Sequence, residues 1–153
     1  MRRFLSLYLP LVAWLAFISY ASSDSFNAGN TSRIIGPLVL WLFPNTSAET
    51  LLSIHIITRK AAHFTEYAIL AFLAARAFRT SPRPALAKRW FLVSFVLVVA
   101  YALLDEYHQS FVPSRTGSIY DSLIDISGGL TALLLIKWFQ RPRRRSKFDS
   151  SIV

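Results

Sequence analysis

Four runs of apolar residues constrain this chain more than any other feature, because each can form a helix in a lipid bilayer. The runs are residues 4–20, 61–78, 90–104 and 119–139. A bilayer core about 30 Å thick needs roughly 20 helical residues, so flanking residues must continue the first and third runs. For the third run, that continuation is residues 105–109. We predict an all-α, polytopic membrane protein with four transmembrane helices.

The composition agrees with this fold class. Hydrophobic residues make up 54% and charged residues 16% of the chain, whereas soluble domains have about 45–50% and about 25%. The 5 Gly and 7 Pro residues exclude a collagen-like or disordered chain. With 0 Cys residues, the chain has no disulfide framework, thiol nucleophile or cysteine metal site.

Two segments have alternative interpretations. The first run also resembles a cleaved signal peptide, because it has a basic start and small residues after it. Cleavage would leave three spans and place the two ends of the mature chain on opposite sides, so we favour a retained helix. Residues 34–43 are too short to span the bilayer and contain Gly36-Pro37. We expect this segment to lie in the interface and to end at Pro44-Asn45.

Basic residues set the expected orientation, because they concentrate in cytoplasmic loops. With both termini inside, 13 of the 17 Lys and Arg residues lie on the inner side, and Arg33, Arg59, Lys60 and Arg115 lie outside. We therefore expect a membrane domain over residues 1–140 and a basic cytoplasmic tail over residues 141–153. Topology and attraction to anionic lipid, about 1 kcal/mol per basic residue, explain the tail. It does not predict nucleic-acid binding.

Ionisable residues gather at the ends of three helices that this orientation places outside. Each costs about 2.5–3.5 kcal/mol in a span on insertion scales, which favours a functional site. Hydrogen bonding between helices without chemistry is the structural alternative, but buried ion pairs stabilise only weakly. The candidate catalytic residues are His63, Glu66, Asp105, His108 and Asp121, and the candidate substrate-binding residues are Arg59, Lys60, Tyr67, Glu106, Gln109, Arg115 and Asp125.

The second and fourth helices are expected to begin on this outer side, where unpaired backbone N–H groups and the helix dipole favour anions. Arg59, Lys60 and Arg115 stand beside these ends, and an arginine fork suits phosphate. The abundant phosphates at this depth are lipid head groups, including polyprenyl-linked ones. In the alternative, the helix ends only hold the clustered carboxylates through their dipoles and salt bridges.

Three blocks of this sequence resemble the VanZ-like membrane proteins. They are residues 59–67 (RKAAHFTEY), 105–115 (DEYHQSFVPSR) and 121–128, and they lie in the order and spacing of that family within residues 59–135. Some members have Asp at the position of Arg59 and Asn at that of Asp125, whereas this chain resembles another branch.

The resemblance implies a small multi-pass protein of the bacterial cytoplasmic membrane. The founding member is associated with low-level resistance to teicoplanin, a lipid-bearing glycopeptide that acts on cell-wall precursors. The resemblance also implies a distant relation, proposed for the family, to enzymes that exchange or hydrolyse lipid head groups. On that view the polar residues at the outer face form the active site.

Three classes of function stay open. The leading class is an enzyme that hydrolyses or transfers a phosphate-containing lipid head group. In it His63 or His108 is the general base or transient nucleophile, and Glu66 or Asp105 orients that imidazole. The second class is a non-catalytic protein that binds and shields a wall-precursor lipid or lipopeptide. The third is a proton-coupled transporter, for which the sequence has no inverted repeat.

In the enzyme class, Arg59 and Arg115 bind phosphate, and Asp121 orients a hydroxyl or holds a divalent metal. His63, Glu66, Asp105 and Asp121 have suitable ligand types, but no HExxH motif or Cys/His cluster specifies a metal. The expected partner is a membrane lipid, including a polyprenyl-linked wall precursor. The cofactor and the oligomeric state stay unknown from the sequence.

Overall fold

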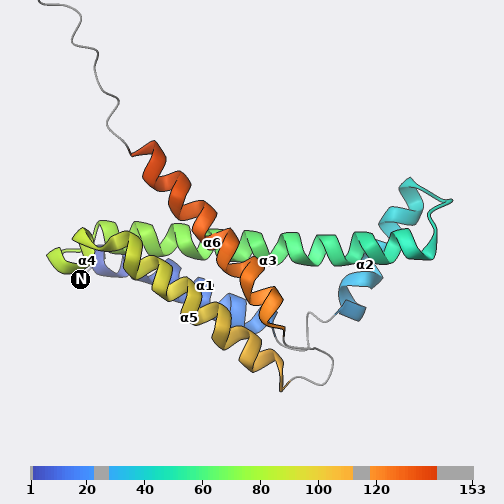
Figure 1. The fold of residues 1–153 in the computed structure, drawn as a ribbon, viewed down its shortest axis with the longest axis horizontal. Helices are drawn as coiled ribbons and strands as arrows, with labels where there is room; N and C mark the ends of the chain where they lie inside the picture. Colours follow the sequence, from blue (N-terminus) through green and yellow to red (C-terminus); the bar gives the residue numbers. More distant parts are fainter. Residues whose placement is uncertain (1, 23–27, 112–117, 141–153) are drawn as a thin grey trace, which may run out of the picture.

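The computed structural model describes residues 2–22, 28–111 and 118–140, and these residues form helices joined by short turns, with no strand among them (Figure 1). This confirms the predicted all-α class. The helices are α1 (Arg2–Ala21), α2 (Ala28–Leu42), α3 (Ala48–Arg79), α4 (Pro84–Lys88), α5 (Trp90–Gln109) and α6 (Ile119–Phe139).

The 32-residue helix α3 is the axis of the fold. It contacts α1, α2, α4, α5 and α6. Figure 1 shows α1, α5 and α6 gathered along one part of α3, while α2 lies beside its other end. Because α3 has this many neighbours, its rotation decides which of its side chains meet the other helices.

Helix α3 begins 13 residues before the apolar run that predicts it. Its start is specified locally, because the Ser47 side chain caps the helix by accepting from the backbone N–H of Thr50 at 3.2 Å. Glu49 in the first turn adds a favourable interaction with the helix dipole. Arg59 and Lys60 therefore lie inside α3, and the sequence-based placement of these cations beside a helix N-terminus is wrong.

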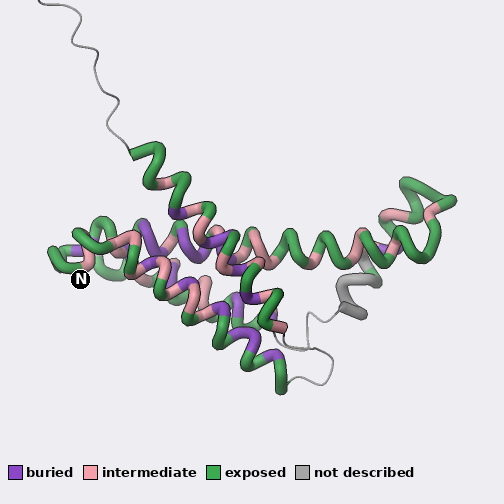
Figure 2. Tube along the Cα trace, in the orientation of Figure 1, coloured by how far each residue is buried: buried purple, intermediate pink, exposed green. Residues whose placement is uncertain are grey.

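The core lies where α1, α3, α5 and α6 meet, and Figure 2 shows buried residues concentrated there. Helix α3 contributes several alanines to it, and small side chains allow helices to approach closely. The buried apolar residues of this core are Leu11, Ile18, Tyr67, Leu70, Ala71, Ala74, Ala75, Ala77, Val98, Ala102 and Leu133.

Two glycines of α6 lie directly against neighbouring helices: Gly128 against the backbone of α3 and Gly129 against Val98 of α5. A Cβ atom at Gly128 would clash with the backbone carbonyl of Phe64, and one at Gly129 would lie 2.6 Å from Cγ1 of Val98. Both contacts are closer than a side chain tolerates, so glycine is required here for packing. Gly128 thus permits the close approach of α6 to α3, and Gly129 permits that of α6 to α5.

Hydrogen bonds fasten α1 to the same bundle. The indole Nε1 of Trp14 donates to the carbonyl of Glu66 at 2.9 Å, and the Tyr101 hydroxyl donates to the carbonyl of Leu15 at 2.6 Å. At the other end of α1, the Tyr8 hydroxyl donates to Oγ of Ser81 at 3.0 Å. Helix α1 is therefore an integral part of the fold.

Three helices of the described chain are long and apolar enough to cross a membrane: residues Phe4–Ala21 of α1, all of α5 and all of α6. Helix α5 extends to Gln109, which confirms the predicted continuation of the third run. Large apolar side chains such as Phe72, Leu92 and Leu134 are exposed on the bundle surface, as expected for contact with lipid. Helix α2 ends at Leu42, two residues before the predicted stop at Pro44, and it begins at Ala28, before the predicted segment 34–43.

A fourth crossing by α3 predicts that its two ends lie on opposite sides of the membrane. Because the chain has 0 Cys residues, Asn45→Cys and Arg83→Cys each give a single thiol at an exposed position flanking α3. A membrane-impermeant maleimide should label Asn45→Cys in intact cells and Arg83→Cys only after the membrane is opened. Ser110→Cys, beyond α5, should behave like Asn45→Cys. Labelling of both flanking positions from one side would contradict a fourth crossing.

Candidate functional site

Three of the predicted site residues converge where α3, α5 and α6 meet. His63, Asp105 and Asp125 each present one ligand-type atom, and these atoms lie within 4.8 Å of one another. Nδ1 of His63 lies 3.4 Å from Oδ1 of Asp125. We call these three residues the buried cluster.

Burial differs between the members of this cluster. The Asp125 side chain is 0% exposed, whereas the His63 side chain is 18% exposed. Among the described residues, neither carboxylate oxygen of Asp125 has a hydrogen-bond partner, and neither does Nδ1 of His63. A buried carboxylate without hydrogen bonds is costly, so Asp125 is a poor choice for stability alone.

Asp105 is held in place from its own helix. Nε2 of Gln109, one turn later on α5, donates to Oδ2 of Asp105 at 2.9 Å, and both residues are buried. Asp105 also lines a pocket with Ser19, Tyr101 and His108. The buried cluster therefore borders a pocket formed by α1 and α5.

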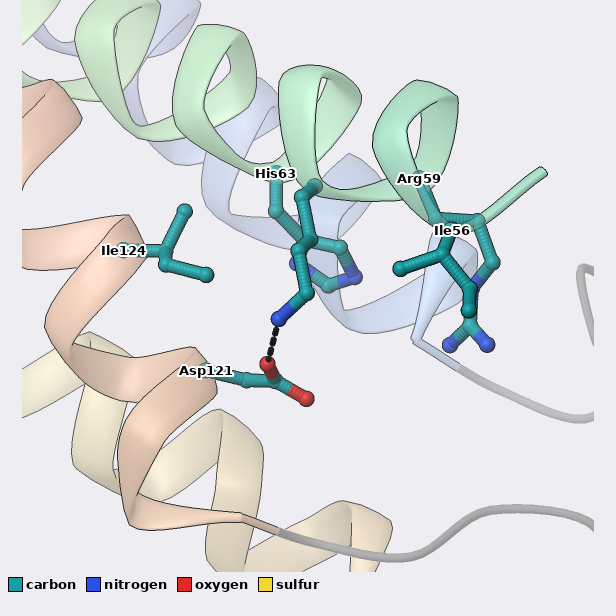
Figure 3. Close-up of a pocket in the computed structure, with 6 residues that line it drawn as sticks. Ile56, Arg59, His63, Asp121 and Ile124 are labelled. Carbon is teal, nitrogen blue, oxygen red and sulfur yellow. Dashed lines mark hydrogen bonds and ion pairs between the residues drawn. The ribbon is translucent and has the colours of Figure 1, made fainter. Parts of the chain in front are cut away.

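A second pocket lies between α3 and α6, and His63 is one of its lining residues. Figure 3 shows Arg59 and His63 extending from α3 toward the space into which Asp121 extends from α6. Nζ of Lys60 lies 2.9 Å from Oδ1 of Asp121, which is the dashed contact in Figure 3. The full lining is Ile56, Arg59, Lys60, His63, Asp121 and Ile124, and we call it the α3–α6 pocket.

The beginning of α6 already has an anionic partner. Oε2 of Glu106 accepts from the backbone N–H of Ser118, the N-cap residue, at 2.6 Å. A carboxylate at this position satisfies an N–H group that the helix leaves unpaired. Glu106 was predicted to bind substrate, and its contact instead favours the alternative in which the helix end holds a carboxylate of the chain.

Two of the remaining predicted residues, Glu66 and Tyr67, make contacts outside the buried cluster. Glu66 lines a groove that also contains Trp14 and Phe17 of α1. Tyr67 is fully buried, and its hydroxyl donates to the carbonyl of Tyr101 at 3.4 Å. Arg115 lies outside the described residues, as does the tail at residues 141–153.

Sequence reasoning missed the contribution of α1. Oγ of Ser19 lies 2.6 Å from the Tyr101 hydroxyl, and both residues line the pocket that contains Asp105 and His108. A search based on ionisable residues could not find Ser19, because it has no charge. A hydroxyl within an otherwise apolar span is the signal that was available.

Replacing Asp125 should reveal its cost to stability. In buffer containing a chelator, we expect Asp125→Asn to unfold at a temperature equal to or a few degrees above that of the wild type, because the variant removes a buried carboxylate without hydrogen bonds. Thermal unfolding in detergent measures this, with Asp121→Asn as the matched control. The Asp121 side chain is partly exposed, so we expect its loss to change stability by less than about 1 kcal/mol. A marked loss of stability in Asp125→Asn alone would mean that Asp125 supports the fold.

Comparison with known proteins agrees with the resemblance found in the sequence blocks. A family model described as VanZ/LLP1 matches residues 5–140, which extends from α1 to the end of α6. No curated protein and no solved structure matches the chain. Because the family match covers most of the sequence, and because the chain has helices of membrane-spanning length, it belongs to the VanZ/LLP1 family of membrane proteins.

Proposed function

We propose that this chain is an enzyme of the bacterial cytoplasmic membrane that hydrolyses or transfers phosphate-containing lipid head groups at the α3–α6 pocket. One observation carries the proposal. Two cations, Arg59 and Lys60, line the same pocket as His63, whose imidazole contacts the buried carboxylate of Asp125. A site for head-group chemistry requires a phosphate-binding group beside a group that transfers protons.

Arg59 is the better phosphate ligand of the two cations. Lys60 is already neutralised by Asp121 at 2.9 Å, whereas Arg59 forms no ion pair within the described part of the chain. A guanidinium can hold two phosphate oxygens at once. In this proposal Arg59 binds the phosphate, and the pair of Lys60 and Asp121 forms one wall of the pocket.

His63 acts as the general base, and Asp125 orients its imidazole. The sequence assigned the orienting role to Glu66 or Asp105, but Asp125 is the carboxylate at 3.4 Å from Nδ1 of His63. In hydrolysis, His63 takes a proton from water while the water oxygen bonds to phosphorus. The bond from phosphorus to the leaving oxygen breaks, and that oxygen takes a proton from solvent.

The apolar part of the pocket supports a lipid rather than a free phosphate as the ligand. Ile56 and Ile124 lie beside the cations in the α3–α6 pocket. A lipid has a charged head joined to an apolar chain, so it would contact both kinds of residue. The apolar surface of the neighbouring helices gives such a chain access from the bilayer.

The same chemistry would explain a link to glycopeptide resistance. Teicoplanin carries a lipid and acts on wall precursors outside the membrane, and the expected topology puts both termini in the cytoplasm and the α3–α6 pocket in the outer half of the bilayer. We propose that turnover of such a lipid lowers susceptibility to teicoplanin. Binding without turnover is the competing explanation, and a lipid assay separates the two.

The enzyme proposal predicts a change of lipid composition that depends on His63. Purified protein in vesicles of total bacterial lipid should convert at least one phospholipid or polyprenyl-linked lipid, as measured by mass spectrometry. We expect His63→Ala to lower the rate about 100-fold or more, in the range for loss of a general base. Arg59→Ala should raise KM more than it lowers kcat, because Arg59 binds the phosphate.

The matched control is His55→Ala, since His55 lies on the same helix but does not line the α3–α6 pocket. It should retain the wild-type rate. An unchanged lipid profile with wild-type protein would contradict an enzyme. If teicoplanin susceptibility then still depended on Arg59 but not on His63, the protein would be a binder.

A further inference from the structure

We propose that His63, Asp105 and Asp125 form a binding site for one divalent transition-metal ion, such as Mn²⁺ or Zn²⁺. Each residue offers one ligand atom, and the three atoms lie within 4.8 Å of one another. Imidazole nitrogen and carboxylate oxygen both bind such ions, and sites with three protein ligands leave a position open for catalysis. Asp125 thus replaces Glu66 and Asp121 of the ligand set that the sequence suggested.

The spacing of His63 and Asp125 is the first argument. Their 3.4 Å contact is longer than an N–H···O hydrogen bond of about 2.7–3.2 Å, and neither atom has a hydrogen-bond partner among the described residues. Two ligand atoms about 2.1 Å from one tetrahedral ion lie about 3.4 Å apart. His63 and Asp125 therefore have the spacing of two ligands of one ion. The three atoms lie within 4.8 Å of one another, and two such ligands lie at most about 4.2 Å apart, so binding would draw the outermost pair closer by up to about 0.6 Å.

The burial of Asp125 is an independent argument. Its side chain is 0% exposed, and within the described chain neither oxygen accepts a hydrogen bond. Oδ1 contacts Nδ1 of His63, whereas Oδ2 has no hydrogen-bond partner among the described residues. Buried carboxylates are normally paired, hydrogen-bonded or bound to a metal. A divalent cation in the cluster would supply the missing partner.

Asp105 has the surroundings of a metal ligand. The amide of Gln109 donates to Oδ2 of Asp105 at 2.9 Å, and both residues are buried. Metal-binding carboxylates are usually held by such outer hydrogen bonds, which fix the orientation of the ligand. Gln109, predicted to bind substrate, would position Asp105 instead.

The cluster can be reached from outside the protein. His63 lines the α3–α6 pocket with Arg59 and Lys60, and Asp105 lines the pocket that contains His108. An ion held between them would direct an open position toward one of these pockets. With Nδ1 of His63 bound to the ion, the imidazole would carry its proton on Nε2 and could not act as the general base, so the ion would instead activate the attacking water. That role rests on the proposed function, whereas the ion site itself rests on the ligand geometry.

Mn²⁺ binding tests the site without any lipid substrate. The full chain, purified in detergent and stripped of metal with EDTA, is titrated with Mn²⁺ while EPR measures the free ion. We expect one saturable site per chain and displacement of Mn²⁺ by Zn²⁺. Spin-echo modulation of the bound Mn²⁺ should show ¹⁴N coupling from a coordinated imidazole.

Variants connect this binding to the cluster. Asp125→Asn and His63→Gln should each weaken Mn²⁺ binding at least about tenfold, and His63→Gln should remove the ¹⁴N coupling. His55→Gln is the matched control, because His55 lies on the same helix as His63 but lines neither pocket and is not part of the cluster. It should leave the affinity within about twofold, because a histidine that is not a ligand makes no bond to the ion.

Three results would each overturn the metal site: no saturable Mn²⁺ binding, no ¹⁴N coupling in the wild type, or equal weakening by His55→Gln. The wild-type spectra decide the matter even when a variant fails to fold. Normal Mn²⁺ binding without lipid turnover would contradict the proposed function alone. Lipid turnover that persists in EDTA, with no Mn²⁺ binding, would contradict the metal site alone.

Discussion

The close approach of α6 to α3 at Gly128 is the constraint on which the rest of the structure depends. A side chain at this position would clash with the backbone of Phe64, so glycine is needed for the two helices to cross here. Asp125 lies one turn before Gly128, and His63 directly precedes Phe64. The crossing that packs the helices therefore also brings Nδ1 of His63 to 3.4 Å from Asp125.

Most of the bundle is stabilised by contacts that any helical membrane protein uses, with alanines on α3 facing the neighbouring helices. The buried cluster is different, because Asp125 gains no hydrogen bond among the described residues in return for its burial. Local rules of stability fail most often at functional sites. The α3–α6 pocket adds cations beside this cluster, and this combination is the basis for the proposed head-group chemistry.

The bounds of α5 and α6 could be predicted because a lipid environment demands apolar runs of about 20 residues. The start of α3 could not, since residues 48–60 carry polar groups and the cap at Ser47 determines where the helix begins. The types of residue in the site were predictable as well, but their partners were not. The spacing of residues along one helix does not give the rotation of that helix against another. For this reason Asp125 was predicted to bind substrate, and Glu66 or Asp105 was predicted to orient an imidazole. The structure instead pairs Asp125 with His63 and places Glu66 beside α1.

A double-mutant cycle between His63 and Asp125 tests most directly whether α3 and α6 form one site. The free energy of unfolding is measured by SDS titration for the wild type, His63→Asn, Asp125→Asn and the double variant. His63→Asn should destabilise the protein when Asp125 is present, because it leaves a buried carboxylate without its ion-pair partner. It should have little effect when Asp125 is already Asn, which gives a coupling of about 1 kcal/mol or more. Additive effects within about 0.5 kcal/mol would contradict the contact, and with it the site.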